Sequence, residues 1–254
     1  MNKEPYMYND KQFEEVEKFV EEKFGSHYDY IVHEIESEYV HTDIFVVKSR
    51  SGEKQFITCG MGAREMSAPN KFKRCELVMM ASNRFVITRE EGMTLATELV
   101  GISKFPFREE TWIGTIHTIN ASEEFKEMFG YDYFVFVRMP QSTKLTGIDD
   151  DINFLMMVPI YEEEREWCVE NHTLAFLEKL HEKYDGKELY ADFKREVFIP
   201  DDLKKDELYD YIVMTALGID KPTLKRLTEY LGQQAENGVE ATYEMIEKWV
   251  SENN

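Results

Sequence analysis

The sequence has few cysteines, and their number and spacing argue against a disulfide framework. The three of them, Cys59, Cys75 and Cys168, are an odd number, are widely spaced and lie among apolar neighbours. Disulfide-rich domains carry even numbers of cysteines, and many zinc sites use C-x-x-C pairs. We therefore expect three small buried side chains and no cysteine-based metal site.

The chain also lacks a long hydrophobic run. No stretch approaches the roughly 20 consecutive apolar residues that span a bilayer, and residues 1–5 lack the apolar core of a signal peptide. We expect a cytoplasmic protein. Hydrophobic residues make up 43% and aromatic residues 13% of the sequence, which is enough for a packed core.

Basic residues are scarce relative to acidic ones. Thirty Lys and Arg stand against 50 Asp and Glu, for a formal charge of -20 with no compensating basic patch. Phosphate repulsion excludes direct nucleic-acid binding and disfavours acidic lipid surfaces. The same field would attract a basic protein partner. Alternatively, the negative charge serves solubility alone. Adaptation to high salt is a third explanation of the charge, and the many lysines argue against it.

Motifs for common chemistries are missing as well. There is no nucleophile elbow, and the glycines of Thr58-Cys59-Gly60-Met61-Gly62 match neither G-x-G-x-x-G nor a P-loop. Tight turns at strand ends explain these glycines better. The six histidines show no ligand spacing; His33 and His41 are eight residues apart across an expected turn. We expect no metal and no cofactor.

Hydrophobic periodicity predicts an α+β fold: a mostly antiparallel sheet with packed helices, plus a C-terminal helical extension. Helices are expected over 13–24, 89–100 and 162–182, with Phe105-Pro106-Phe107 interrupting the helical pattern. Strands are expected over 30–35, 44–47, from 56, and over 76–80, 112–119, 134–137 and 154–160. We predict domains at 1–183 and 184–254, the second with short helices over 206–217, 222–231 and 239–250.

One histidine has a context that merits attention. His117 lies in Thr115-Ile116-His117-Thr118-Ile119, where alternation places it beside Thr115. A general base there would need a nucleophile and an orienting carboxylate nearby. The alternative is a hydrogen-bonded histidine in a sheet.

Two acidic runs flank the strand expected over 154–160. Asp149-Asp150-Asp151 lacks the spaced ligands and glycine turn of a calcium loop, so it is a solvated loop or a patch for basic side chains. Glu162, Glu163 and Glu166 lie at an expected helix start, where carboxylates interact favourably with the dipole. They either stabilise that helix or form an acidic contact surface.

Several short segments, taken together, resemble the suppressor-of-fused-like domain family. They run from about residue 30 to residue 180 in the family's order. They comprise Thr58 with Gly60-Met61, Met66, Pro69 and Glu76-Leu77; Thr111-Trp112, Gly114 and His117-Thr118-Ile119; and Phe154-Leu155, Val158-Pro159-Ile160-Tyr161 and Glu164. Two departures are Ile116, where the family usually has glycine, and Ala81-Ser82, where it often has Leu-Pro.

The resemblance implies a binding protein and not an enzyme. The family's animal member sequesters a transcription factor by gripping an extended peptide, and bacterial members look like immunity proteins that neutralise secreted toxins, often nucleases. The first hypothesis is therefore an immunity protein that binds a basic toxin through Asp149–Asp151 and Glu162–Glu166. A peptide- or protein-binding adaptor is the second, and a hydrolase that uses His117 is the third.

Overall fold

The computed structural model describes residues 4–25, 28–49, 52–69, 72–82, 87–201, 210, 213–214, 217–237, 239 and 242–253. The chain forms two compact units, interleaved in sequence. Unit 1 comprises Met1–Arg165 and Tyr184–Val197, and unit 2 comprises Glu166–Lys183 and Phe198–Asn254. The domain boundary that we expect at residue 183 stays a prediction.

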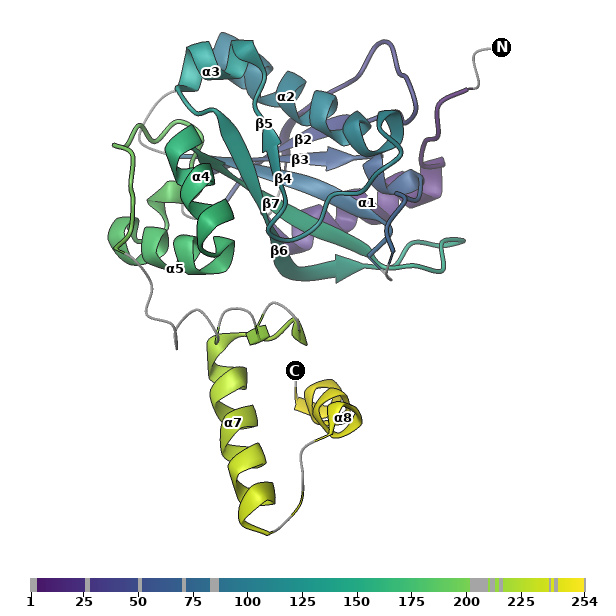
Figure 1. The fold of residues 1–254 in the computed structure, drawn as a ribbon. Helices are drawn as coiled ribbons and strands as arrows, with labels where there is room; N and C mark the ends of the chain where they lie inside the picture. The colour runs from purple at the N-terminus through teal and green to yellow at the C-terminus, as the bar shows by residue number, and fades with distance from the viewer. Residues whose placement is uncertain are drawn as a thin grey trace. The chain divides into compact units, whose positions relative to one another are not determined.

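Unit 1 is built on a seven-stranded sheet in the order β1-β2-β3-β4-β7-β6-β5 (Figure 1). Its strands are β1 (Tyr28–Val32), β2 (Asp43–Lys48), β3 (Lys54–Cys59), β4 (Cys75–Ala81), β5 (Thr118–Asn120), β6 (Tyr133–Thr143) and β7 (Ile152–Ile160). Every neighbouring pair is antiparallel except β4 and β7. This mixed sheet with its helices confirms the predicted α+β class.

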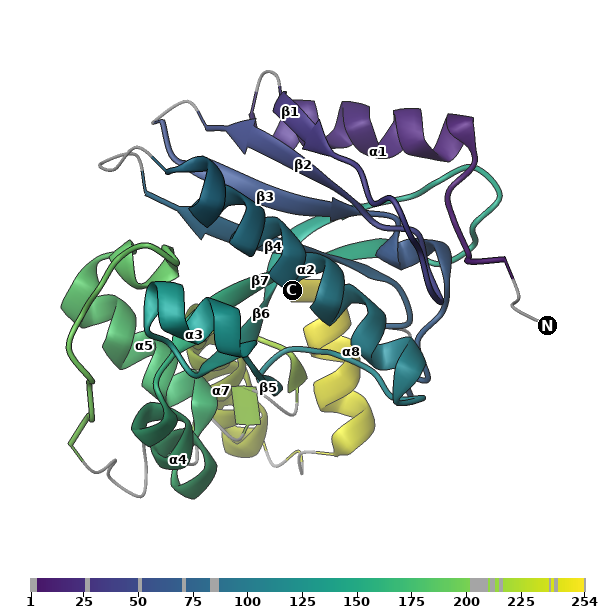
Figure 2. The ribbon, with the colours of Figure 1, turned by 90° about the horizontal axis from the view of Figure 1, so that it is seen from above.

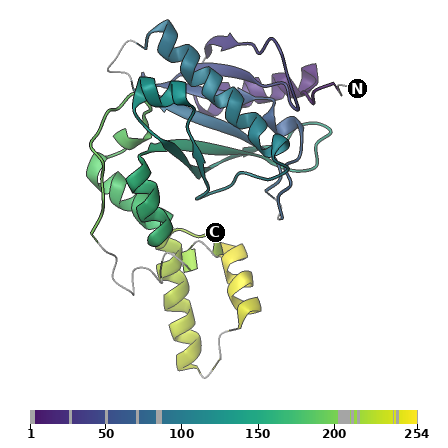
Figure 3. The ribbon, with the colours of Figure 1, turned by 45° about the horizontal axis from the view of Figure 1, so that its top comes forward.

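Helices cover both faces of this sheet (Figures 2 and 3). On one face, α1 (Asp10–Lys23) stacks Phe19 on Phe154 of β7, with 5.2 Å between the ring centroids. On the other, α2 (Arg89–Arg108) and α3 (Glu123–Phe129) contribute Leu99 and Phe125 to the main core. Capping boxes at Asn9 and Thr88 fix the starts of α1 and α2, since each satisfies otherwise free backbone N–H groups.

Two local expectations were wrong. The strand expected over 112–119 is limited to β5, because the chain turns at Ile116, whose φ is 66°. Helix α2 continues through Pro106 to Arg108. Proline is tolerated there because it lies in the last turn, where it removes a single backbone hydrogen bond, and because Pro106 and Phe107 are buried in the core.

The helix expected over 162–182 is two helices, α4 (Glu162–Glu170) and α5 (Thr173–Tyr184). Residues 171 and 172 separate them, and the backbone N–H of Asn171 still donates to Trp167 O. Helix α3 was not foreseen, because its seven residues are too few to establish a helical period.

The segment Tyr184–Val197 belongs to unit 1 and is hydrogen-bonded to the end of β4. The backbone N–H of Ala191 donates to Met80 O (2.8 Å), and the side chain of Asp192 accepts from both the N–H and the Oγ of Ser82 (2.7 Å each). We call residues 184–197, which include the short helix η2 (Lys187–Leu189), the strap.

Unit 2 contains α5, α7 (Lys221–Glu236) and α8 (Tyr243–Asn253). Helix α7 begins at Asp220, whose side chain accepts from Thr223 N, and Pro222 occupies its first turn. Tyr230 of α7 stacks on Trp249 of α8, with ring centroids 5.8 Å apart. The helix expected over 206–217 lies almost wholly outside the described residues.

All three cysteines are free and buried, as the sequence predicted. Within the described part of the chain, no helix is both long and apolar enough to cross a bilayer.

Candidate partner-binding site

The segment that carries most of the family resemblance surrounds a buried carboxylate, that of Glu76. Its oxygens accept hydrogen bonds from Tyr8 Oη (2.8 Å), Thr58 Oγ1 (2.5 Å) and the backbone N–H groups of Gly60 and Gly62 (3.0 Å each). All four partners are neutral donors. Burial raises the pKa of Glu76, and the four hydrogen bonds act against that rise because they favour the ionised form.

Close packing explains why glycine occupies positions 60 and 62. Gly60 has φ of 131°, and a Cβ there would lie 2.0 Å from His41 O. A Cβ at Gly62 would lie 2.4 Å from Tyr8 Oη, one of the four donors to Glu76. The described part of this segment therefore organises the fold around the buried carboxylate of Glu76.

His117 lies at the start of β5, half-buried against Trp112, with 4.3 Å between the two ring centroids. Its backbone oxygen accepts from Phe136 N (3.0 Å). Burial lowers the pKa of His117, and a hydrogen bond to the backbone of Trp112 partly opposes this. Among the described residues, no hydroxyl, thiol or carboxylate is hydrogen-bonded to the ring, so the structure does not assemble the nucleophile and orienting carboxylate that a hydrolase would require.

Asp149, Asp150 and Asp151 lie in the loop between β6 and β7. Asp149 is exposed, Asp150 lies 3.7 Å from Arg74 Nε, and Asp151 lies 3.7 Å from Lys144 Nζ. The structure attaches this loop to α1, which the sequence did not indicate. Thr146 donates to Glu15 through both its N–H (2.7 Å) and its Oγ1 (2.6 Å), and Gln12 Nε2 donates to Thr146 O (2.9 Å).

The second acidic run lies at the other end of β7. Glu162, Glu163 and Glu166 are exposed, at the start of α4. Nine residues of β7 separate this run from Asp151, or roughly 30 Å at about 3.3 Å per residue. The structure therefore does not bring the two predicted acidic runs together, and Glu166 belongs to unit 2.

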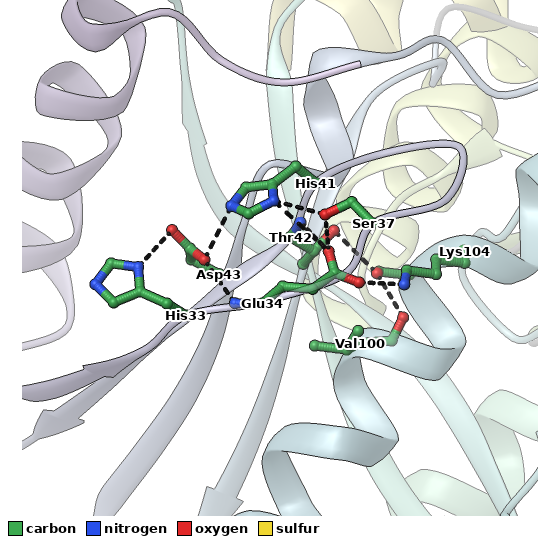
Figure 4. A network of polar contacts seen from close by, with 9 residues as sticks. His33, Glu34, Ser37, His41, Thr42, Asp43, Val100 and Lys104 are labelled. Carbon is green, nitrogen blue, oxygen red and sulfur yellow. Dashed lines mark hydrogen bonds and ion pairs between the residues drawn. The ribbon is translucent and has the colours of Figure 1, made fainter. Parts of the chain in front are cut away.

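A polar network that the sequence analysis did not identify connects β1, β2 and α2 (Figure 4). Asp43, whose side chain is 8% exposed, contacts His33 Nδ1 (3.1 Å) and His41 Nε2 (3.2 Å), and it accepts from Glu34 N (3.0 Å). Glu34, 6% exposed, accepts from Ser37 Oγ and Thr42 N (2.9 Å each) and pairs with Lys104 of α2. The eight-residue spacing of His33 and His41 was visible, but their common carboxylate was not.

Ser37, His41 and Asp43 stand in the order hydroxyl, imidazole, carboxylate, with 2.6 Å between Ser37 Oγ and His41 Nδ1. This order is that of a nucleophilic triad. The hydroxyl of Ser37 however donates its proton to Glu34 Oε2 (2.9 Å), which leaves no hydroxyl proton for His41 Nδ1 to accept. The network is better explained as a clamp that holds the connection between β1 and β2 against α2.

Two hollows in the described surface of unit 1 lie near the features above. One, of about 760 Å³, lies between the start of α2 and the strap, with Glu53, Glu91, Asp185 and Asp192 among its lining residues. The other, of about 240 Å³, lies beside the Figure 4 network at the start of α1. Across the described residues, no three His, Cys, Asp or Glu side chains form a group that could hold a metal ion.

Comparison with known proteins agrees with the resemblance. The family model for suppressor of fused protein matches residues 38–196, more than half of the chain. A putative suppressor of fused homolog from Neisseria gonorrhoeae FA 1090 is similar in structure, with a TM-score of 0.51 and 17% identity over 74% of this chain and 98% of that one.

The Sufu chain of a Sufu–Fu complex is also similar, with a TM-score of 0.58 and 12% identity over 79% of this chain and 100% of that one. At such identities the likeness of structures shows the fold alone. No curated protein matches the sequence. By the extent of the family match, this chain belongs to the suppressor of fused protein family.

Proposed function

We propose that this protein is an immunity-type binding protein that neutralises a basic toxin, such as a nuclease, by covering its cationic surface. The observation that carries the proposal is the attachment of the Asp149–Asp151 loop to α1 through Glu15 and Thr146. We call the surface made by α1 and residues 144–151 the acidic face. It contains nine acidic and four basic residues.

A fixed acidic face suits this role for a physical reason. Asp149 and Glu14 are exposed and lie on elements that are hydrogen-bonded to each other, so little backbone ordering remains when a partner binds. Complementary charge on the two proteins increases the rate at which they associate and fixes how they align in the complex. The Sufu of the similar structure is in complex with a protein, Fu, which supports a protein-binding role for this fold.

The experiment begins with the immobilised full-length chain and native cell extract, eluted with stepped salt. A retained basic protein is then expressed in cells with and without this chain. The proposal requires one partner that is released at high salt and is toxic only when this chain is absent. Several unrelated partners released without regard to salt would contradict it.

Charge-reversal variants locate the contact. Glu14→Lys with Asp149→Lys should weaken the complex strongly, whereas Glu162→Lys with Glu163→Lys carries the same charge change at the other end of β7. Equal loss in both variants would mean that only net charge matters. Loss in the second variant alone would assign the contact to the start of α4.

A second candidate function is an adaptor that binds an extended peptide, and the free edge at β5 favours it. Strand β5 is the last strand of the sheet, and Ile119 pairs with Phe134 of β6. Alternation along an antiparallel strand then directs the backbone groups of Thr118 and Asn120 away from β6. Binding that is insensitive to salt and is abolished by Thr118→Pro, which removes an outward N–H, would favour the adaptor.

A further inference from the structure

The smaller hollow in unit 1 has walls of two kinds. Its apolar side is formed by Met7, Tyr8, Phe13 and Cys59. Its polar side is formed by three carboxylates, those of Asp10, Glu14 and Asp43, together with His41. At about 240 Å³ it is smaller than the roughly 300–1,000 Å³ of sites for drug-sized ligands, which suits a single side chain.

The carboxylates differ in what they already contact. Asp43 is held from behind by His33, His41 and the backbone of Glu34, so its position is fixed before any ligand arrives. Asp10 and Glu14 are exposed, and no hydrogen bond or ion pair joins either side-chain carboxylate to another described residue.

Their spacing makes this lack of partners informative. Asp10 and Glu14 are four residues apart on α1, and like charges at this spacing destabilise a helix. The position of Asp10 in the first turn offsets part of that effect through the helix dipole. A cation between the two carboxylates would relieve the repulsion.

The rim of the hollow is apolar and accessible. Met7 is 63% exposed, and Phe13 is partly exposed beside it. A flat cationic group can lie against an aromatic ring while it donates to carboxylates, and the guanidinium of arginine does both because it is planar and carries five donors. An arginine that fills a hollow surrounded by apolar contacts is also a common centre of binding energy in protein interfaces.

We propose that this hollow receives one arginine side chain of the basic partner, with the guanidinium between Asp10 and Glu14 and the stem against Met7 and Phe13. This inference rests on the proposed function, because it names the group through which the acidic face would grip its partner. Asp43, which is buried, supplies a third carboxylate to the lining of the hollow.

The first test uses N-acetyl-arginine amide as the probe and N-acetyl-citrulline amide as its uncharged analogue. Titration of the ¹⁵N-labelled full chain at pH 8 should give saturable shifts at the amides of Gly60 and Glu14 with the arginine probe and much weaker ones with citrulline. The double variant Asp10→Asn/Glu14→Gln should weaken arginine binding by about tenfold or more, as expected for losing charge-assisted hydrogen bonds.

Glu22→Gln, at the other end of α1, is the matched control and should leave the titration unchanged. Equal binding of both probes, or equal effects of the double variant and the control, would overturn the inference.

The second test separates this inference from the proposed function. If a toxin is captured and Asp10→Asn/Glu14→Gln binds it as tightly as the natural chain, arginine binding in the hollow is refuted while the immunity role stands. If the arginine probe binds as expected and no toxin is found, arginine binding in the hollow is supported and the proposed role fails.

Discussion

Two of the carboxylates that unit 1 buries, those of Glu76 and Glu164, are stabilised in opposite ways. Glu76 is surrounded by neutral donors that come mostly from the nearby segment 58–62. Glu164 is paired with Arg195 of the strap, and both side chains are 0% exposed. Arg195 Nη2 donates to Glu164 Oε2 (2.7 Å) and to Pro159 O (3.1 Å).

Aromatic rings complete the surroundings of the ion pair. The guanidinium of Arg195 lies 5.4 Å from the ring centre of Tyr131 and 5.1 Å from that of Tyr161. Tyr161 Oη also donates to Arg195 O (2.5 Å). The two sites differ in one respect: the hydrogen bonds of Glu76 favour its negative charge without any cation, whereas Glu164, which also accepts from Tyr161 N (3.0 Å), is paired with a cation 31 residues away in sequence.

The largest expected effect comes from removing that cation. Arg195→Met should lower the free energy of unfolding by about 3–5 kcal/mol, because it leaves Glu164 buried without its partner. Lys194→Met, at an exposed neighbouring position, should change stability by less than about 0.5 kcal/mol. Urea unfolding measures both variants.

The double variant Arg195→Met/Glu164→Met tests whether the pair itself stabilises the fold. Replacing both charges by apolar groups should recover most of the loss, since a buried pair is often nearly neutral relative to an apolar substitute. A double variant as unstable as Arg195→Met would contradict the assignment of the loss to the Glu164 charge left without its cation.

Glu76→Gln should have a smaller effect, of about 1–3 kcal/mol. The glutamine amide has one acceptor oxygen and one NH₂ group where the carboxylate has two acceptor oxygens, so one acceptor oxygen of this network is lost. Tyr8→Phe removes one donor and should lower the unfolding free energy by about 1 kcal/mol. Tyr6→Phe, at an exposed tyrosine nearby, is the control. Unchanged urea unfolding of Glu76→Gln would contradict a stabilising role for the hydrogen bonds to Glu76.

The thiols of Cys59 and Cys75, whose pKa values the charge of Glu76 influences, should be unreactive in the native protein. Burial raises the pKa of Cys59 and Cys75 well above the usual value, and the negative charge of Glu76 raises both further. Because the thiolate is the reactive form, iodoacetamide at pH 8 should modify these residues only after unfolding in urea. Rapid labelling of the folded chain at Cys59, identified by mass spectrometry, would show that the Glu76 site opens readily.

The smallest expected effect is a pH dependence due to His117. Its folded pKa is lowered by burial, so neutral His117 contributes stability above the unfolded pKa of about 6.5, and this contribution is lost as the pH falls through the folded value. His117→Gln should therefore flatten the fall in unfolding free energy below about pH 6.5. His172, whose pKa burial also lowers, should account for a remaining slope.

Much of the fold was predictable because local sequence patterns determine many of its strands and helices. The unbroken apolar run from Phe154 to Ile160 and the helical period of residues 13–24 indicate a strand and a helix, since each depends only on neighbouring side chains. Where a local rule failed, as at Pro106, packing into the core outweighed it. Asp149–Asp151 and Glu162–Glu166 were visible as acidic runs, but their separation by the length of β7 was not.

By itself, the sequence determined the fold class, the family and the burial of the three cysteines, because period, composition and a dispersed motif are all properties of the chain. Tertiary structure alone decided that Arg195 neutralises Glu164, that Thr146 ties the acidic loop to Glu15, and that His33 and His41 share Asp43. These contacts join residues up to 131 positions apart. Their formation depends on how the strands and helices pack, which no local pattern records.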